Sequence, residues 1–166
     1  MNTQQHAVGV HHQYDVVCRG EDGVIKWREE FSNLVVDTGL DQYLDSLTGS
    51  ALSLFIGLTD GTPTIVGGNT MASHAGWTEV TAYDESARQA LTLAAASSQS
   101  RTNSANVATF TISTNSTTVG GAFVTTDSTR GGTSGTLIAA GAFSSDKAAD
   151  DGDTIEVTVT LTMAAA

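Results

Sequence analysis

The segment near the C-terminus alternates strictly between apolar and polar residues. Ile155, Val157, Val159, Leu161 and Met163 fall on one side of an extended chain, and threonine or glutamate occupies each position between them. Successive side chains of a β-strand point to opposite faces, so this segment predicts a strand with one buried and one polar face. Similar alternation recurs along the chain and predicts an all-β protein.

Residues typical of turns and loops separate the other segments of this kind. The expected strands are His6–Cys18, Val24–Phe31, Leu52–Leu58, Trp77–Tyr83, Gln89–Ala95, Val107–Ser113, Val119–Thr126, Thr136–Phe143 and Ile155–Met163. Strand starts every roughly 8–12 residues are typical of an antiparallel β-sandwich or barrel, and we expect a jelly-roll-like sandwich. We expect one compact unit, with residues 1–31 as an N-terminal β-hairpin or arm suited to contacts and residues 32–166 as the sandwich domain.

One segment has the period of a helix. Its apolar residues on a shared helical face are Leu40, Tyr43, Leu44 and Leu47. Thr38 and Asp41 match the short form of a capping box, and Gly49 follows where a C-terminal glycine is common. The pattern therefore predicts one short helix, about Asp37–Leu47, laid over the end or the face of a sheet.

The charge and the hydropathy pattern exclude two classes of partner. The formal net charge is −11, and the seven lysine and arginine residues are scattered. Nucleic-acid affinity depends on clustered cations, so we expect no nucleic-acid partner. No apolar run approaches the ~20 residues of a membrane helix, and the N-terminus has no secretory-signal pattern, so we expect no membrane contact and synthesis in the host cytoplasm. Cys18 is the single cysteine, so no disulfide within the chain is expected.

The histidines do not have the spacing of a metal site. His11 and His12 are adjacent in an expected strand, so their side chains point to opposite faces. His6 and His74 have no carboxylate or cysteine at ligand spacing. We expect no metal site built on histidine.

An acidic cluster lies just before the last strand. Its members are Asp146, Asp150, Asp151 and Asp153. The spacing around Gly152 does not match the EF-hand pattern, so the cluster predicts a solvated hairpin turn in which Gly152 tolerates a positive φ. An irregular calcium site near Asp146–Asp153 remains the alternative.

No segment has the residues and spacing of a catalytic motif. Gly132-Thr133-Ser134-Gly135 lacks the spacing of a nucleophile elbow, and Cys18 has the character of a buried small apolar residue. We therefore expect a protein that is not an enzyme and binds no cofactor.

The region from Leu34 to Met163 contains a series of landmarks in a characteristic order. They are NLVVDTGLDQYLD, FIGLTD, MASHAGWTE, Tyr83, Arg88, Ala108-Thr109-Phe110, Gly121-Ala122-Phe123, GGTSGTLIAAGAF and Gly152-Asp153. In this order the chain resembles a structural-protein family of tailed bacteriophages, found among virion head and tail components. The resemblance implies a capsid decoration (cement) protein on the outer surface of the head. Its expected partners are the major capsid protein and other copies of itself, as a dimer or trimer. The alternative is a tail-fibre or tail-tip module, structural or receptor-binding.

Two segments are the expected contacts. The N-terminal segment Met1–Gln13 lies outside the matched region, and Asp60–Gly76 is longer than an ordinary connection. Trp77 follows this loop, and we expect its ring to be buried in the core or under the loop. The residues expected at the partner interface are His6, Val8, Val10, Pro63, Ile65, Val66 and Trp77.

Overall fold

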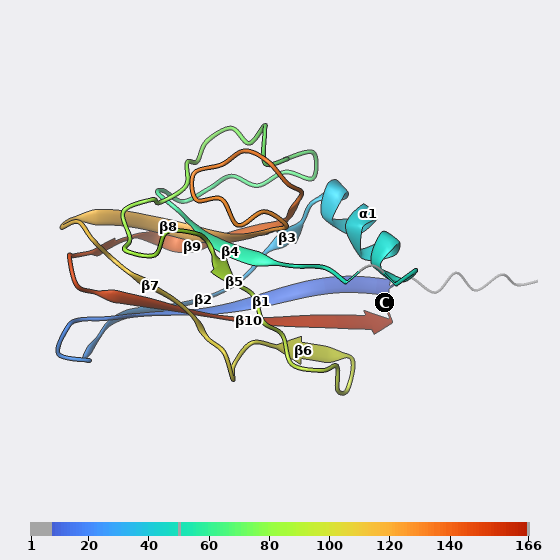
Figure 1. The fold of residues 1–166 in the computed structure, drawn as a ribbon, viewed down its shortest axis with the longest axis horizontal. Helices are drawn as coiled ribbons and strands as arrows, with labels where there is room; N and C mark the ends of the chain where they lie inside the picture. The colour runs from blue at the N-terminus through green and yellow to red at the C-terminus, as the bar shows by residue number, and fades with distance from the viewer. Residues whose placement is uncertain (1–7, 50, 166) are drawn as a thin grey trace, which may run out of the picture.

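Two antiparallel β-sheets and one short helix make up the fold. The computed structural model describes residues 8–49 and 51–165 (Figure 1). The first sheet contains β1 (Val8–Arg19), β2 (Ile25–Ser32), β6 (Ser100–Thr102), β7 (Ala108–Thr111) and β10 (Thr154–Ala165). The second contains β3 (Leu34–Val35), β4 (Phe55–Thr59), β5 (Gln89–Ala90), β8 (Thr117–Thr125) and β9 (Leu137–Ala149). The predicted all-β sandwich is confirmed.

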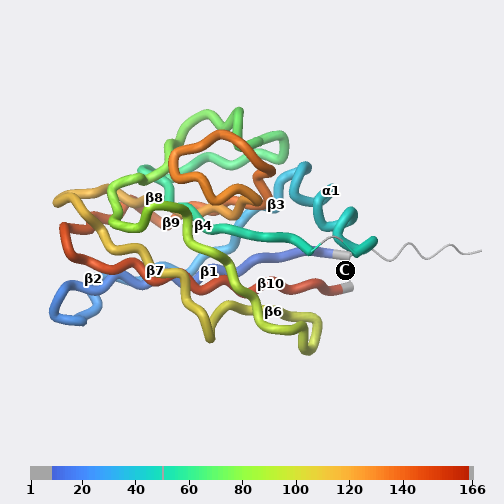
Figure 2. Tube along the Cα trace, in the orientation of Figure 1, coloured from blue at the N-terminus to red at the C-terminus, as the bar shows by residue number. Residues whose placement is uncertain are grey.

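Strand β10 lies in the middle of the first sheet. The order is β2-β1-β10-β6, and β7 pairs with another part of β10. Strands β1 and β10 pair over their full length, from Val8 opposite Ala165 to Arg19 opposite Thr154, and run side by side in Figure 2. Ile155, Val157 and Val159 are fully buried on the inner face. The alternation therefore correctly predicted an inward-facing strand.

The second sheet is covered on both faces. Its order is β3-β9-β8-β4-β5, and every residue of β8 from Val119 onward is buried. One face packs against the first sheet, while residues 60–77 and the β8–β9 loop lie over the other (Figure 1). A second apolar cluster holds this loop layer in place. Its buried members are Val36, Met71, Trp77, Phe123, Leu137 and Ala140.

The loop layer explains where the predicted strands differ from the structure. Trp77–Tyr83 forms no strand and makes only isolated bridges, Glu79 with Thr59 and Tyr83 with Ile112. Its alternation buries Trp77 against the outer face of the second sheet, without a ladder. The predicted strand Gln89–Ala95 is paired only at β5, and the short strands β3 and β6 were not predicted because so few residues show no period.

Helix α1 (Asp37–Ser46) forms where it was predicted, but its leucines face outward. Leu40, Leu44 and Leu47 are 42%, 64% and 77% exposed, whereas Gly39 is the buried residue of the helix. A Cβ atom on Gly39 would overlap the backbone carbonyl of Ile138. This close approach sets the rotation of the helix. Tyr43 of the predicted apolar face packs against the core, but the expected burial of the leucines was wrong.

The predicted capping box was also wrong. The N-cap residue is Val36, which has no side-chain cap hydrogen bond. Thr38 Oγ1 instead donates to the carbonyl of Leu137 in β9 at 2.9 Å, and Asp37 N donates to the carbonyl of Gly67 at 2.9 Å. The helix start is thus held by strand β9 and by the loop layer.

The role of Gly39 yields a stability test. Gly39→Ala should destabilise the fold by about 2 kcal/mol, because the added methyl group must push the helix away from β9 and this outweighs the helix propensity of alanine. Gly68→Ala is the matched control, since a Cβ atom there meets open space. Urea unfolding of both variants measures the effect, and a Gly39→Ala protein as stable as the parent would contradict the account.

Candidate functional site

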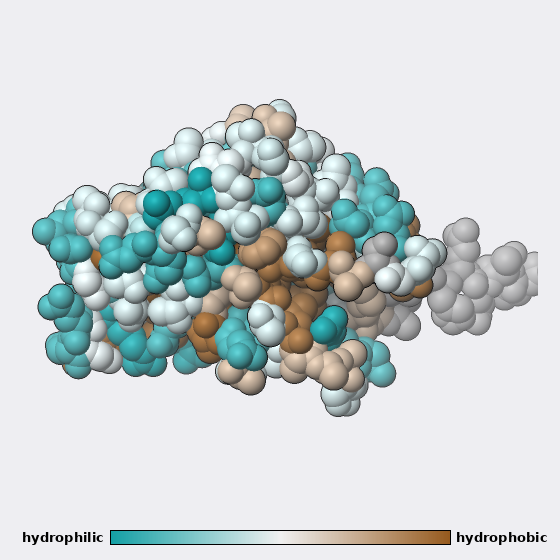
Figure 3. All heavy atoms as spheres, viewed as in Figure 1, coloured by the Kyte–Doolittle hydropathy of each residue, from teal (hydrophilic) through white to brown (hydrophobic). Residues whose placement is uncertain are grey.

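An apolar groove of about 710 Å³ opens between the two sheets. It lies where both sheets end in very short strands, β5 and β6, and no further strand of residues 8–49 and 51–165 closes the space. Figure 3 shows it as the brown area in the middle of the face. The apolar side chains that line it include Val10, Tyr43, Leu52, Leu54, Leu91, Leu93, Leu161 and Met163. An apolar groove on a protein of net charge −11 is a candidate binding surface.

Helix α1 borders this groove. Tyr43 and Ser46 contribute to its lining, while Leu44 and Leu47 stand exposed on the same helix. The groove and the helix together form the candidate site.

A buried ion pair fastens the loop layer. Arg88 donates from Nε and Nη2 to the two carboxylate oxygens of Glu79 at 2.9 and 2.7 Å, and the two side chains are 0% and 7% exposed. Arg88 also donates to the carbonyls of Asp127 and Gly132, while Gly131 N donates to Glu79. The guanidinium lies over the Phe123 ring in β8. These contacts join the Glu79 segment, the β8–β9 loop and the second sheet.

The MASHAGWTE landmark belongs to this same layer. Trp77 is 5% exposed, which confirms its predicted burial, and its ring stacks on His74 with 3.7 Å between centroids. Nε1 of Trp77 and Nδ1 of His74 have no hydrogen-bond partner among the described residues. A small cavity of about 320 Å³ is lined by both side chains and has room for ordered water. The landmark therefore serves packing.

The ion pair can be tested through stability. Glu79→Gln should destabilise the protein by roughly 3 kcal/mol, because it leaves the Arg88 charge buried without its main counter-charge. Glu30→Gln is the control, since Glu30 and its partner Arg28 are both more than half exposed. There we expect less than about 0.5 kcal/mol. Equal losses in the two variants, measured by urea unfolding, would contradict this role.

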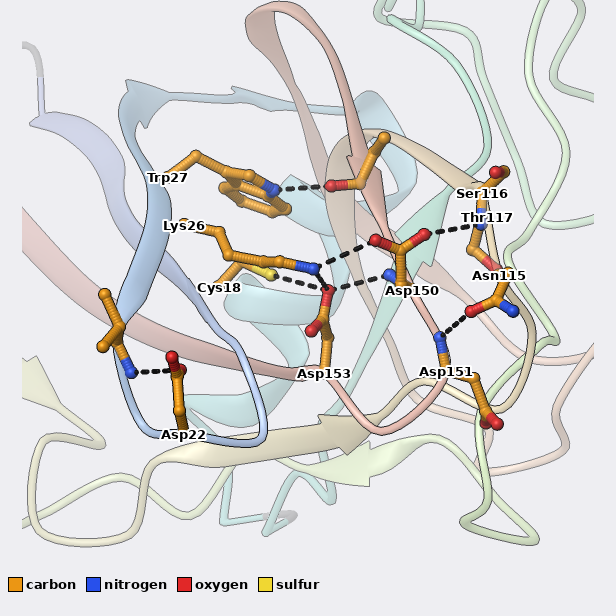
Figure 4. Close-up of polar contacts among 12 residues, drawn as sticks. Cys18, Asp22, Lys26, Trp27, Asn115, Ser116, Thr117, Asp150, Asp151 and Asp153 are labelled. Atoms are coloured by element: carbon orange, nitrogen blue, oxygen red, sulfur yellow. Dashed lines mark hydrogen bonds and ion pairs between the residues drawn. The ribbon is translucent and has the colours of Figure 1, made fainter.

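Asp150, Asp151 and Asp153 of the acidic cluster form the corner where the chain passes from β9 to β10 (Figure 4). Asp146 lies within β9 and accepts from the backbone N of Thr62 at 2.7 Å. The Asp153 carboxylate accepts from Lys26 Nζ and from the backbone N of Asp150, both at 2.7 Å. Asp150 pairs with Lys26 and accepts from the backbone N of Ser116, and this backbone bond, with Lys26, lowers its pKa. These carboxylates thus stabilise the turn. No group of three or more potential metal-binding side chains occurs among the described residues.

Two details of this corner bear on the predictions. Gly152 has a φ of 81°, as the turn prediction required. The turn is not a hairpin, however, because β9 and β10 belong to different sheets. Cys18 lies beneath it, fully buried, and burial together with the Asp153 carboxylate raises the pKa of its thiol to about 12. The thiol is therefore protonated at neutral pH, in keeping with a packing role.

A buried polar network joins β1 to the helix, and the sequence did not reveal it. His12 is 1% exposed, and its Nε2 lies 2.7 Å from the hydroxyl of Tyr43. Its Nδ1 lies 3.1 Å from Asn33 Nδ2, which also donates to the hydroxyl of Tyr14. Burial, with a smaller contribution from His11, lowers the pKa of His12 to about 4. His12 is therefore neutral in the folded protein at pH 7, and His11 points to the opposite, exposed face as predicted.

This network predicts acid destabilisation. The unfolded chain binds a proton on His12 below about pH 6.5, whereas the folded protein does so only near pH 4. Stability should therefore fall as the pH drops through this window, by about 2 kcal/mol between pH 7 and pH 5. Chemical unfolding of the parent and of His12→Gln at both values tests this. A pH dependence that is unchanged in His12→Gln would contradict the assignment.

The structure places the predicted interface residues in different environments. His6 lies outside the described residues, and Val8 begins β1. Pro63 and Trp77 are buried, and Ile65 packs against the second cluster. Val10 lies at the groove, and Val66 is 53% exposed.

Sequence reasoning missed the outward leucines of α1 and the groove beside them. The available signal was Gly39 within the helix, because a glycine there allows close approach to a strand. The loop Asp60–Gly76, a predicted contact element, lies mostly in the loop layer over the second sheet.

Comparison with known protein families, with curated proteins and with solved structures found no match for this chain. Within the described residues, helix α1 is too short and too polar to cross a membrane.

Proposed function

We propose that this chain is a structural protein of a tailed-phage virion, a decoration (cement) protein that binds the outside of the assembled head. The observation that supports binding is the apolar groove together with the exposed leucines of helix α1 on a chain of net charge −11. Such surface on an otherwise acidic protein is suited to a protein partner. The order of the sequence landmarks between Leu34 and Met163, which resembles that of a phage structural-protein family, supports the assignment to the phage virion.

A cement protein works by mass action. It binds the assembled lattice and has no affinity for the dissociated subunits, so binding lowers the free energy of the assembled state. Each copy needs only modest affinity, because the effect is repeated over the whole shell. The proposed partners are the major capsid protein and other copies of this chain, as a dimer or trimer.

The first test is the location of the protein on the virion. Antibody-gold labelling of intact particles should place many copies over the head. A signal confined to the tail would reject the proposal and favour the alternative, a tail-fibre or tail-tip module. Heads that lack the protein should also rupture at a lower temperature than decorated heads.

The N-terminal segment can be tested by a deletion that respects the fold. Removing Met1–Gln13 would take away the first half of β1, which pairs with β10, so that deletion would disrupt the first sheet. Removing Met1–Ala7 leaves the ladder between β1 and β10 intact. If the segment is a contact element, this shorter deletion should weaken binding to undecorated heads without changing the midpoint of thermal unfolding.

A further inference from the structure

Helix α1 presents a row of leucines that the described residues leave exposed. Leu40, Leu44 and Leu47 become progressively more exposed along the helix, from 42% to 77%. The contact of Gly39 with Ile138 holds them outward, so the helix cannot turn them inward without moving off β9. The apolar row is therefore a fixed feature of the surface.

The same helix carries an acidic row. Asp37, Asp41 and Asp45 are exposed and spaced four residues apart, so they lie along one side of the helix. None of the three forms an ion pair with any described residue, and the last turn has no basic residue. Like charges at this spacing repel, and Asp45 also lies near the negative end of the helix dipole. The aspartates of the free helix therefore repel one another, and a cation bound beside them would reduce this repulsion.

Charge complementarity selects one kind of occupant. A second copy brings another net charge of −11, and phosphate-bearing partners such as nucleic acid or an anionic bilayer would be repelled. A polypeptide with lysine or arginine beside apolar side chains satisfies both rows at once.

We infer that the outward face of helix α1, continuous with the groove through Tyr43 and Ser46, docks a basic, apolar segment of the partner protein. This inference deepens the proposed function, on which it rests for the identity of the partner. The chemistry of the docking face stands apart from it and can be tested alone.

The probe is a synthetic peptide with a repeating Leu-Lys-Lys-Leu sequence, and its counterpart carries Glu in place of Lys. Fluorescence anisotropy with the intact protein should detect binding of the lysine peptide and not of the glutamate peptide. Equal binding of the two peptides, or binding of neither, would overturn the inference.

Charge reversal on the helix locates the site. The double variant Asp41→Lys with Asp45→Lys should weaken binding of the lysine peptide at least ~10-fold. The matched control is Asp84→Lys with Asp151→Lys, which changes the net charge equally at two exposed aspartates elsewhere. We expect less than ~3-fold weakening there. If both double variants weaken peptide binding equally, net charge alone accounts for the effect, and the assignment of the site to helix α1 is overturned.

The leucine row has its own control. Leu44→Ser with Leu47→Ser should weaken peptide binding ~10-fold, whereas Val24→Ser with Ile25→Ser, two other exposed apolar residues at the β1–β2 turn, should not. Sedimentation of the parent at the same concentrations tests the rival occupant. Self-association that the leucine substitutions abolish would assign the face to a second copy and overturn the inference.

Binding to undecorated heads separates the two claims. Heads that bind the protein while the leucine and aspartate variants bind equally well would overturn the inference and leave the proposed function standing. Peptide binding at helix α1 by a protein that labels only the tail would overturn the proposed function and leave the docking chemistry standing. Thermal unfolding checks that each variant is folded, and Asp41→Lys with Asp45→Lys should be at least as stable as the parent.

Discussion

The contact between Gly39 and the backbone of Ile138 determines which surface the protein offers. A side chain at position 39 would hold the helix off β9, and the helix could then rotate its leucines over the sheet. With glycine the backbones meet directly, Thr38 bonds to Leu137, and the leucines remain outside. Hydrogen bonds at the start of helix α1 hold the helix in one orientation, so the exposed leucine face is the same in every copy of the protein.

The two sides of the sandwich are built differently. The loop layer covers the outer face of the second sheet. There the buried Arg88–Glu79 pair also forms hydrogen bonds with backbone groups of the β8–β9 loop. The landmarks MASHAGWTE and Arg88 contribute there to stability and packing. The edge of the sandwich between β5 and β6 is left open and apolar. A covered outer face and an open apolar edge fit the proposal that this protein binds a larger assembly.

Sequence reasoning succeeded where burial follows a local period. Ile155–Met163 alternates because one face meets the core, and Val119–Val124 of β8 has no polar side chain because both faces are covered there. It failed where a distant contact decides the outcome. The rotation of helix α1 depends on Ile138, about one hundred positions along the chain from Gly39. The burial of His12 depends likewise on Tyr43 and Asn33, and the groove arises from the shortness of two edge strands, which no local pattern reveals.

A density map of the intact virion, at a resolution that separates side chains, tests the central claim most directly. The account predicts this chain on the outer surface of the head, with helix α1 and the groove facing a neighbouring protein and basic side chains of that neighbour beside Asp41 and Asp45. A chain located at the tail would contradict the proposed function. A chain on the head with helix α1 directed into solvent would contradict the assignment of the docking face.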